Sequence, residues 1–177
     1  MASETAVIRP YVEQFIHGAG LDIGCGEDKI APGAVGLDLA RTYGWGHGAR
    51  TQADVIGRWE ETLGAFADGS QDYVYSSALL EDYADAAAVL AAWASKVRAG
   101  GVLVLALPHE GLYQESCRQA GQPRNGAHRQ NWQGAADFVR QAPACLRDEF
   151  ELVASGDVPG HYMFYVVYRK IASYGGD

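Results

Sequence analysis

Seven short apolar runs, spaced along most of the chain, limit the fold more than any other feature of this sequence. They are GLDI (20–23), AVGLDL (34–39), ADVI (53–56), DYVYSS (72–77), GVLVLAL (101–107), FELVAS (150–155) and MFYVVYR (163–169). Such runs are typical of strands that are buried on both faces, and helical segments alternate with them. The pattern predicts an α/β fold in which parallel strands are joined by crossover helices.

The end of the chain has a spacing that a parallel crossover does not allow. VPGHY (158–162) precedes the last run, whereas a crossover between parallel strands takes about a dozen residues or more. We therefore expect the last two strands to form an antiparallel hairpin. With 177 residues and no linker of biased composition, the chain should form one domain over residues 1–177.

Two segments have helical periodicity. Apolar residues at helical spacing predict a helix over 4–16, although Pro10 disfavours regular helix in its first turn. A second helix is expected within 82–101. Its apolar stripe consists of Val89, Leu90, Trp93 and Val97. Lys96 falls in its last turn, and Gly100 is expected to cap its C-terminus.

Charge and cysteine content exclude several classes of protein. Lys and Arg total 14 against 22 Asp and Glu, and this net charge of −8 disfavours a nucleic-acid partner. The three cysteines are far apart and the histidines lack metal-binding spacing, so neither disulfides nor a metal site is expected. No run approaches ~18 apolar residues and no leader pattern is present, so we expect a cytoplasmic protein without a membrane partner.

The first run leads into a turn, Gly24-Cys25-Gly26, that allows the backbone to approach a ligand closely. A dinucleotide fingerprint needs another glycine where Lys29 stands, and the GK[ST] ending of a phosphate loop is absent. Asp38 ends the second run, where a carboxylate can accept hydrogen bonds from a ribose. Together these residues indicate a nucleoside site without pyrophosphate; taken singly, each is explained equally well as a tight turn or a helix cap.

Four motifs in this order resemble those of class I S-adenosylmethionine-dependent methyltransferases, specifically the small type with a D-x-G-C-G turn. They are LDIGCG, GLDLA, DYVYSSALLED and VRAGGVLVLALP, and the resemblance covers about residues 18 to 110. It implies S-adenosylmethionine as the methyl donor. It also implies a seven-stranded, mostly parallel Rossmann-like sheet of order 3-2-1-4-5-7-6, with strand 7 antiparallel and helices on both faces.

The resemblance further implies which residues bind the cofactor. The methionine and ribose parts would contact the first strand and its turn, at Asp22, Gly24, Cys25 and Gly26. The ribose hydroxyls would be held by the end of the second strand, at Asp38 and Leu39. Adenine would contact the end of the third strand, at Asp54 and Val55, and the methionine moiety would contact Ser76 and Ser77 after the fourth.

Two positions depart from the family's pattern. Asp28 replaces a glycine that is often present in the turn, and Asp82 stands where many relatives have histidine. About ten residues separate the first two strands, so we expect a short helix that begins at Asp28 and ends before Gly33. Lys29 could then offer its ammonium to the cofactor's carboxylate, or remain a solvated surface residue.

The acceptor side is less determined. Methyl transfer to an oxygen requires removal of a proton, and the candidate bases are His109, Asp82, His128 and Tyr113, each of which has a competing interpretation as a rim or packing residue. Residues 108–149 are long for one connection and are expected to be a substrate-side insertion. Its arginines, Arg118, Arg124 and Arg129, indicate an anionic small molecule or are ordinary surface residues.

The sequence therefore predicts a methyltransferase that acts on a small molecule, such as a sugar, a lipid precursor or a secondary metabolite, and releases S-adenosylhomocysteine. A glycine-rich loop at 41–50 should be mobile, and its Trp45 could cover adenine or contact a partner subunit. A homodimer that completes a shallow acceptor pocket is expected. Two alternatives remain open, a non-catalytic cofactor-binding module and an NAD-dependent oxidoreductase.

Overall fold

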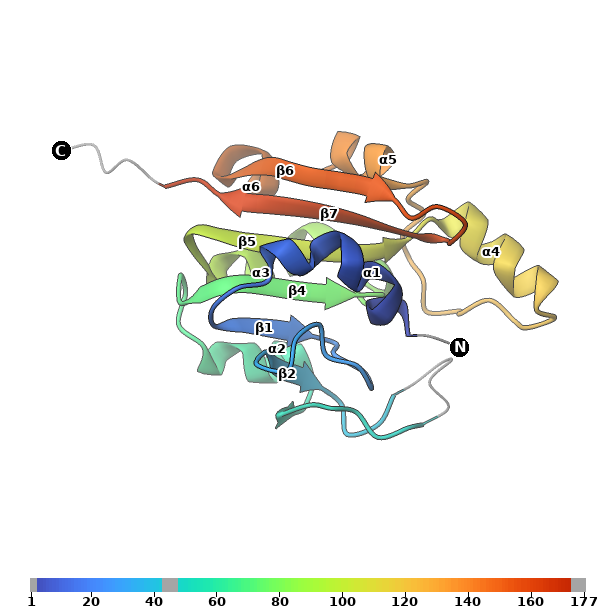
Figure 1. Cartoon of the computed structure of the whole chain (residues 1–177), viewed down its shortest axis with the longest axis horizontal. Helices are drawn as coiled ribbons and strands as arrows, with labels where there is room; N and C mark the ends of the chain where they lie inside the picture. The colour runs from blue at the N-terminus through green and yellow to red at the C-terminus, as the bar shows by residue number, and fades with distance from the viewer. Residues whose placement is uncertain (1–2, 43–47, 173–177) are drawn as a thin grey trace.

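Seven strands form one sheet in the order β3-β2-β1-β4-β5-β7-β6 in the computed structural model, which describes residues 3–42 and 48–172 (Figure 1). The strands are β1 (Gly20–Ile23), β2 (Val35–Asp38), β3 (Val55–Ile56), β4 (Gln71–Ser77), β5 (Val97–Pro108), β6 (Phe150–Asp157) and β7 (Met163–Lys170). The first five run parallel, and β7 is antiparallel to both of its neighbours. The predicted strand order and terminal hairpin are confirmed.

Helices cover both faces of this sheet. They are α1 (Glu4–Val12), α2 (Trp59–Thr62), α3 (Ala86–Lys96), α4 (Glu110–Gln119), α5 (Ala135–Arg140) and α6 (Ala144–Glu149), with 3₁₀ turns η1 (Glu13–Phe15), η3 (Leu63–Ala65) and η4 (Leu80–Asp82). In Figure 1, α1 lies across the near face, α3 lies behind the sheet, and α4 extends from the edge to which the parallel strands point.

Two apolar layers hold the helices on the sheet. Alternate residues of β4 enter different layers, because successive side chains of a strand point to opposite faces. Tyr73 and Tyr75 pack with Ile8 of α1, whereas Val74 packs with Trp93 of α3. Each large apolar side chain that is removed from water contributes roughly 1.5–3 kcal/mol, so these layers supply the main driving force for the fold.

The first helix forms where the apolar spacing predicts it. The Ser3 hydroxyl accepts a hydrogen bond of 2.9 Å from the N–H of Ala6 and caps the helix. Pro10 lies inside α1, and the chain continues as η1 to Phe15. Proline costs about 3 kcal/mol inside a helix, and burial of Ile8 and Val12 offsets this cost.

The C-terminus of α3 differs from the prediction. The helix ends at Lys96, and Val97 is already extended and pairs with Gln71 as the first residue of β5. Gly100 is therefore not a helix cap; it lies in an irregular part of β5 with φ +75°. Strand pairing with β4, a contact between distant segments, sets this boundary.

No helix forms between β1 and β2, so the expected short helix from Asp28 to Gly33 is wrong. Hydrogen bonds from other elements satisfy this segment instead. The N–H of Ile30 donates to the Asp22 carboxylate across 2.6 Å, and Arg9 of α1 donates to the carbonyls of Lys29 and Ile30. These partners satisfy the backbone groups that a helix would pair internally, so the eleven residues 24–34 can cross between adjacent strands as turns.

Candidate cofactor site

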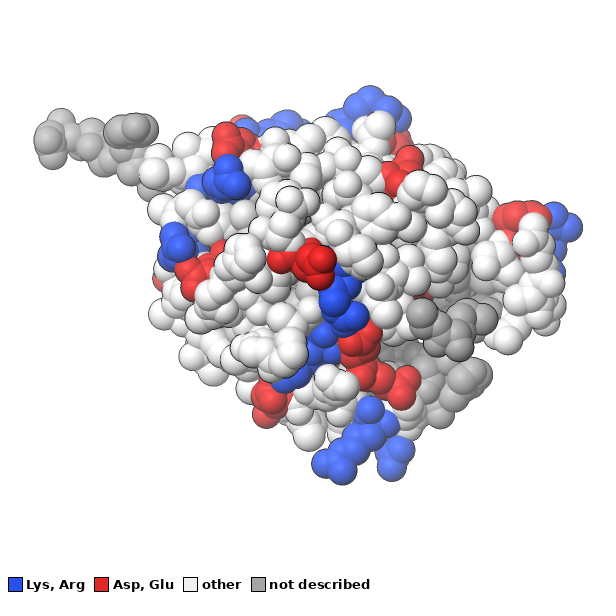
Figure 2. Space-filling view, in the orientation of Figure 1, with Lys and Arg blue, Asp and Glu red and all other residues white. Residues whose placement is uncertain are grey.

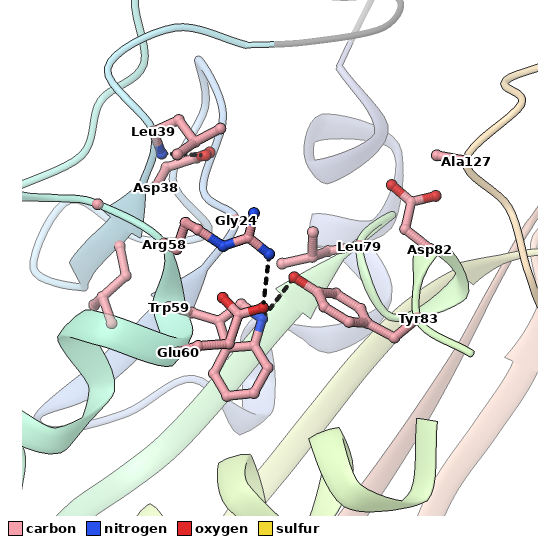
Figure 3. Close-up of a pocket in the computed structure, with 12 residues that line it drawn as sticks. Gly24, Asp38, Leu39, Arg58, Trp59, Glu60, Leu79, Asp82, Tyr83 and Ala127 are labelled. Carbon is pink, nitrogen blue, oxygen red and sulfur yellow. Dashed lines mark hydrogen bonds and ion pairs between the residues drawn. The ribbon is translucent and has the colours of Figure 1, made fainter. Parts of the chain in front are cut away.

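A cleft of about 360 Å³ opens where the carboxyl ends of β1, β2 and β3 meet the segment that follows β4 (Figure 3). Its walls come from Gly24 after β1, Leu37–Leu39 at the end of β2, 57–60 after β3, and Leu79, Asp82, Tyr83 and Ala127. Ligand pockets commonly have ~300–1,000 Å³. The cleft therefore has room for a nucleoside-sized ligand at the edge of the sheet where ligands of open α/β folds bind.

Gly24 forms the floor of the cleft and cannot carry a side chain without strain. Its backbone has φ +76°, and a Cβ placed on it would lie 2.8 Å from Cδ2 of Leu79. Its N–H donates to the carbonyl of Leu37 across 2.8 Å, which holds the turn against β2. The glycine turn is thus required for both the conformation and the close packing, as the sequence pattern predicted.

Asp38 lies in the cleft at the end of β2. One carboxylate oxygen accepts the N–H of Gly26 at 2.8 Å, and the other accepts the N–H of Leu39 at 2.6 Å. Burial raises the pKa of Asp38, and the two hydrogen bonds act in the opposite direction. Each carboxylate oxygen has a second lone pair, so Asp38 can still accept the two hydrogen bonds of a ribose diol.

Asp22 and Cys25 lie outside the cleft lining and support the turn. Asp22 is fully buried, and burial raises its pKa to about 7, while the hydrogen bond from Ile30 lowers it. Its Oδ1 has no hydrogen-bond partner among the described residues. Burial raises the pKa of the Cys25 thiol to about 12, so this cysteine stays protonated. The thiol packs over Gly36, where an added Cβ would lie 2.8 Å from Sγ.

Lys29 and Asp54 are paired with each other. The Lys29 ammonium donates to Asp54 across 2.9 Å and to the carbonyl of Ala34 across 3.1 Å. The hydrogen bond from Lys29 lowers the pKa of the Asp54 carboxyl. Asp54 precedes β3 instead of ending it, so its predicted position is wrong; residues 57–59 follow the strand and line the cleft. Cofactor contacts of Lys29, Asp54 and Val55 stay predictions.

Trp59 and Tyr83 form an aromatic wall that sequence reasoning missed. The indole N–H of Trp59 donates to the Tyr83 hydroxyl across 2.7 Å, and the rings meet edge to face with centroids 5.8 Å apart (Figure 3). Arg58 pairs with Glu60 across 3.1 Å beside them. The signal available in the sequence was the position of Trp59 three residues after the end of the third apolar run.

The end of β4 is held tightly against its neighbours. The buried Ser76 hydroxyl donates to the carbonyl of Ile23 across 2.8 Å and joins β4 to β1. Ala78 follows Ser77 with φ +49°, a left-handed conformation that is rare for a residue with a side chain. Such strain costs on the order of 1–3 kcal/mol and is often found at functional sites. Ser76 and Ser77 line no part of the cleft itself.

The candidate bases are placed differently from one another. Asp82 lines the cleft, while His109 caps α4 by accepting the N–H of Leu112 on its Nδ1. The side chain of His128 is 5% exposed, stacks on Tyr113 with ring centroids 4.7 Å apart, and places Nδ1 2.8 Å from Glu110. Neither histidine is part of the cleft lining. Trp45, on which the predicted adenine cover depended, lies outside the described residues, as does the centre of that loop.

The charges around the cleft are predominantly acidic. Asp38, Glu60 and Asp82 line it, and the arginine described in its lining, Arg58, is paired with Glu60. Elsewhere basic and acidic residues are interspersed, as on the face in Figure 2. Arg9 and Asp28, for example, form an ion pair away from the cleft lining. An acidic cleft favours a cationic ligand and disfavours a pyrophosphate.

Two of the three arginines predicted to bind an anion are paired with acids. Arg118 pairs with Glu115 across 2.5 Å on the exposed surface of α4, and Arg124 pairs with buried Glu110 across 2.7 Å. Their charge is therefore balanced within the protein. Among the described residues, no cluster of potential ligands could hold a metal ion, and none of the described helices is long and apolar enough to span a membrane.

Comparisons with known proteins identify the fold. No protein-family model and no curated protein sequence matches the chain. A methyltransferase from Thermotoga maritima, named as a possible histamine N-methyltransferase, is similar in structure with a TM-score of 0.65 and 13% identity, over 94% of this chain and 89% of its own. A methyltransferase from Archaeoglobus fulgidus is similar with a TM-score of 0.61 and 15% identity, over 96% of this chain and 95% of its own.

An arsenic(III) methyltransferase from Chlamydomonas reinhardtii is also similar, with a TM-score of 0.53 and 15% identity, over 100% of this chain and 76% of its own. All three of these proteins are named as dependent on S-adenosylmethionine. At such identities the likeness concerns the fold. The sheet order, the glycine turn and these neighbours together identify the chain as having the fold of class I S-adenosylmethionine-dependent methyltransferases.

Proposed function

We propose that this protein transfers a methyl group from S-adenosylmethionine to a small-molecule acceptor. The observation that carries the proposal is the pairing of two features in one cleft, the Gly24 turn, which only glycine adopts without strain, and the Asp38 carboxylate. A nucleoside with a free ribose diol and no pyrophosphate is the ligand that both features suit.

The residues present fit S-adenosylmethionine better than a nicotinamide dinucleotide. The cofactor carries a positively charged sulfonium, and the cleft is lined by Asp38, Glu60 and Asp82 against the paired Arg58. A dinucleotide would bring two phosphate charges into the same acidic surroundings, where the repulsion is unfavourable. Trp59 and Tyr83 offer an apolar wall for adenine next to the Asp38 carboxylate.

S-adenosylmethionine supplies an electrophilic methyl group on its sulfur. The protein's task is mainly to align the acceptor with that methyl group and to take a proton from an attacking hydroxyl or amine. Asp38 would orient the ribose, and the turn at Gly24 would let the backbone approach the ligand. Asp82 is the carboxylate of η4 that lines the cleft, and we assign it to contact the acceptor or its proton.

The acceptor is proposed to enter beside Asp82, between η4 and residues 108–149, which we regard as the substrate-side segment. Solved structures of this fold include one protein named as an arsenic(III) methyltransferase and one named as a possible histamine N-methyltransferase, so the fold alone does not select an acceptor. Sugars, lipid precursors and secondary metabolites remain the candidate classes.

Calorimetric titration of the wild-type protein with S-adenosylmethionine, S-adenosylhomocysteine and NAD tests the cofactor assignment. We expect micromolar binding of the first two and much weaker binding of NAD. Failure of the wild type to bind either sulfur compound would overturn the proposal. A screen for S-adenosylhomocysteine release with pooled acceptors then separates an enzyme from a non-catalytic binding module, because a module binds the cofactor without turnover.

A further inference from the structure

A group of ionisable side chains is buried beside the cleft and takes no part in the function proposed above. Glu81 of η4 and Glu110 of α4 are each 2% exposed, and His128 lies between them. Nδ1 of His128 is 2.8 Å from Oε2 of Glu110, and its Nε2 is 3.8 Å from Oε1 of Glu81. Buried charges are costly unless paired, so this arrangement must be held by its partners.

Glu110 is the member with the most contacts. Its Oε1 accepts hydrogen bonds from Arg124 at 2.7 Å and from Gln114 at 2.8 Å, while its Oε2 meets His128. Burial raises the pKa of Glu110, but the hydrogen bonds from Gln114 and His128, together with the charges of His128 and Arg124, lower it overall. Glu110 is therefore ionised, and it connects α4 to Arg124 and His128 of the later chain.

Glu81 has the opposite environment. Burial raises its pKa well above the ordinary value; a hydrogen bond from its own backbone lowers it, and the charges of Asp82, Glu4 and Glu110 raise it further. Its Oε2 has no hydrogen-bond partner among the described residues. The surroundings of Glu81 thus disfavour its charged form, whereas the contacts of Glu110 favour its charged form.

These contacts fasten one stretch of irregular chain, residues 124–132, which we call the cover segment. The carbonyl of Glu81 accepts the N–H groups of Arg129 at 2.7 Å and Gln130 at 3.1 Å. The N–H of Glu110 donates to the carbonyl of Trp132 across 2.9 Å. Ala127, in the middle of the segment, lines the cleft together with Asp82. The cover segment is therefore tied to α4 and η4 on both sides of its cleft-lining residue.

We propose that Glu110 is a positioning residue for the acceptor side of the cleft: through His128 and Arg124 it holds the cover segment where Ala127 forms part of the wall. The claim that Glu110 holds the cover segment in place is independent of the proposed function. The claim that this segment borders an acceptor rests on the proposed function. Glu110 acts on the ligand through other residues, because it does not line the cleft.

Amide hydrogen exchange at Arg129 and Gln130 tests the proposal in the intact protein, with Glu110→Ala, Glu110→Gln and Glu115→Gln. Glu115 is a matched control, since it lies on the same helix and pairs with an arginine on the exposed surface. We expect Glu110→Ala to speed exchange at both amides by about tenfold or more, since charged hydrogen bonds that restrain local opening are lost. Glu110→Gln keeps one acceptor oxygen, so its exchange rates should lie between those of the wild type and Glu110→Ala. Glu115→Gln should exchange at the wild-type rates.

A second arm uses S-adenosylhomocysteine as the probe. Because Ala127 lines the cleft, binding should slow exchange in the cover segment of the wild type, and Glu110→Ala should lose this protection. If Glu110 only stabilised the fold, Glu110→Ala would raise exchange in β4 as much as in the cover segment. Either that result or unchanged exchange in the cover segment would overturn the proposal. If the wild type fails to bind the probe, the cofactor assignment fails, while the ligand-free comparison still decides the role of Glu110.

Discussion

The carboxylate of Asp38 accepts a hydrogen bond from the backbone N–H of Gly26 across 2.8 Å and joins the end of β2 to the turn after β1. The two residues are twelve positions apart in the chain, and parallel pairing of β1 with β2 brings them together. The same contact orients the carboxylate beside the cleft and restrains the turn that forms its floor. Changes at Asp38 should therefore affect ligand binding and the local structure together.

Asp38→Ala should weaken binding of S-adenosylmethionine by about 1.5–3 kcal/mol, the usual contribution of hydrogen bonds to a charged group. Asp38→Asn keeps an oxygen for the N–H of Gly26 and should preserve the turn while it loses part of the ribose contact. Calorimetric titration of both variants measures the two effects. Wild-type affinity in Asp38→Ala would exclude Asp38 from the ribose site.

Gly24→Val should destabilise the fold by roughly 1–3 kcal/mol, because valine is strained at a positive φ, and its Cβ would also meet Leu79 at 2.8 Å. It should also abolish cofactor binding. Gly33→Ala is the matched control, since an added Cβ there contacts nothing within 4 Å. Urea unfolding compares the two; equal stability of the two variants would contradict the account of the turn.

The pH dependence of stability should carry a contribution from Asp22. Its folded-state pKa of about 7 lies above the ordinary value of 3.8, so the native state binds the proton more tightly than the unfolded state. The stabilisation that Asp22 contributes is complete below pH 3.8 and is lost as the pH rises through 7. The difference between the two pKa values corresponds to roughly 4 kcal/mol in the free energy of unfolding.

Asp22→Asn, which stays neutral, should remove this contribution. Urea unfolding at pH 5 and pH 8 should show the variant gaining stability relative to the wild type at the higher pH. Subtracting the wild-type stability from that of the variant at each pH cancels the contributions of other titrating groups, such as Glu81, because both proteins contain them. An identical difference at the two pH values would show that Asp22 does not titrate in this range.

Tyr83→Phe should weaken the aromatic wall of the cleft, because the indole N–H of Trp59 loses its hydrogen-bond acceptor. We expect a loss of about 1 kcal/mol in stability. We also expect weaker binding of S-adenosylhomocysteine, which a titration monitored by tryptophan fluorescence measures. Tyr11→Phe serves as the control, since Tyr11 packs on Tyr165 in a different part of the protein. If both variants bound S-adenosylhomocysteine equally well, the Trp59–Tyr83 pair would not contribute to the binding site.

Much of the fold could be predicted from local patterns. Each buried strand is a run of apolar residues whatever its partner, and VPGHY is too short for a crossover, so the strands and the final hairpin were readable from the sequence. The positions of Gly24 and Asp38 were also readable, because a tight turn and a strand-end carboxylate need particular residue types.

Other features depended on contacts between distant residues and had no local signature. The segment 24–34 lacks a helix because Asp22 and Arg9 satisfy its backbone, and α3 ends at Lys96 because Val97 pairs with β4. Lys29 is paired with Asp54, twenty-five positions away, instead of facing solvent.

The sequence by itself thus determined the strand pattern, the glycine turn and the carboxylate at the end of β2. Only the tertiary structure decided which side chains share the cleft and its surroundings, including the contact of Trp59 with Tyr83 and of Glu110 with His128. The physical reason is that periodicity reports how each segment is buried against the core. Partners in a polar or aromatic contact are chosen by packing geometry that local sequence does not encode.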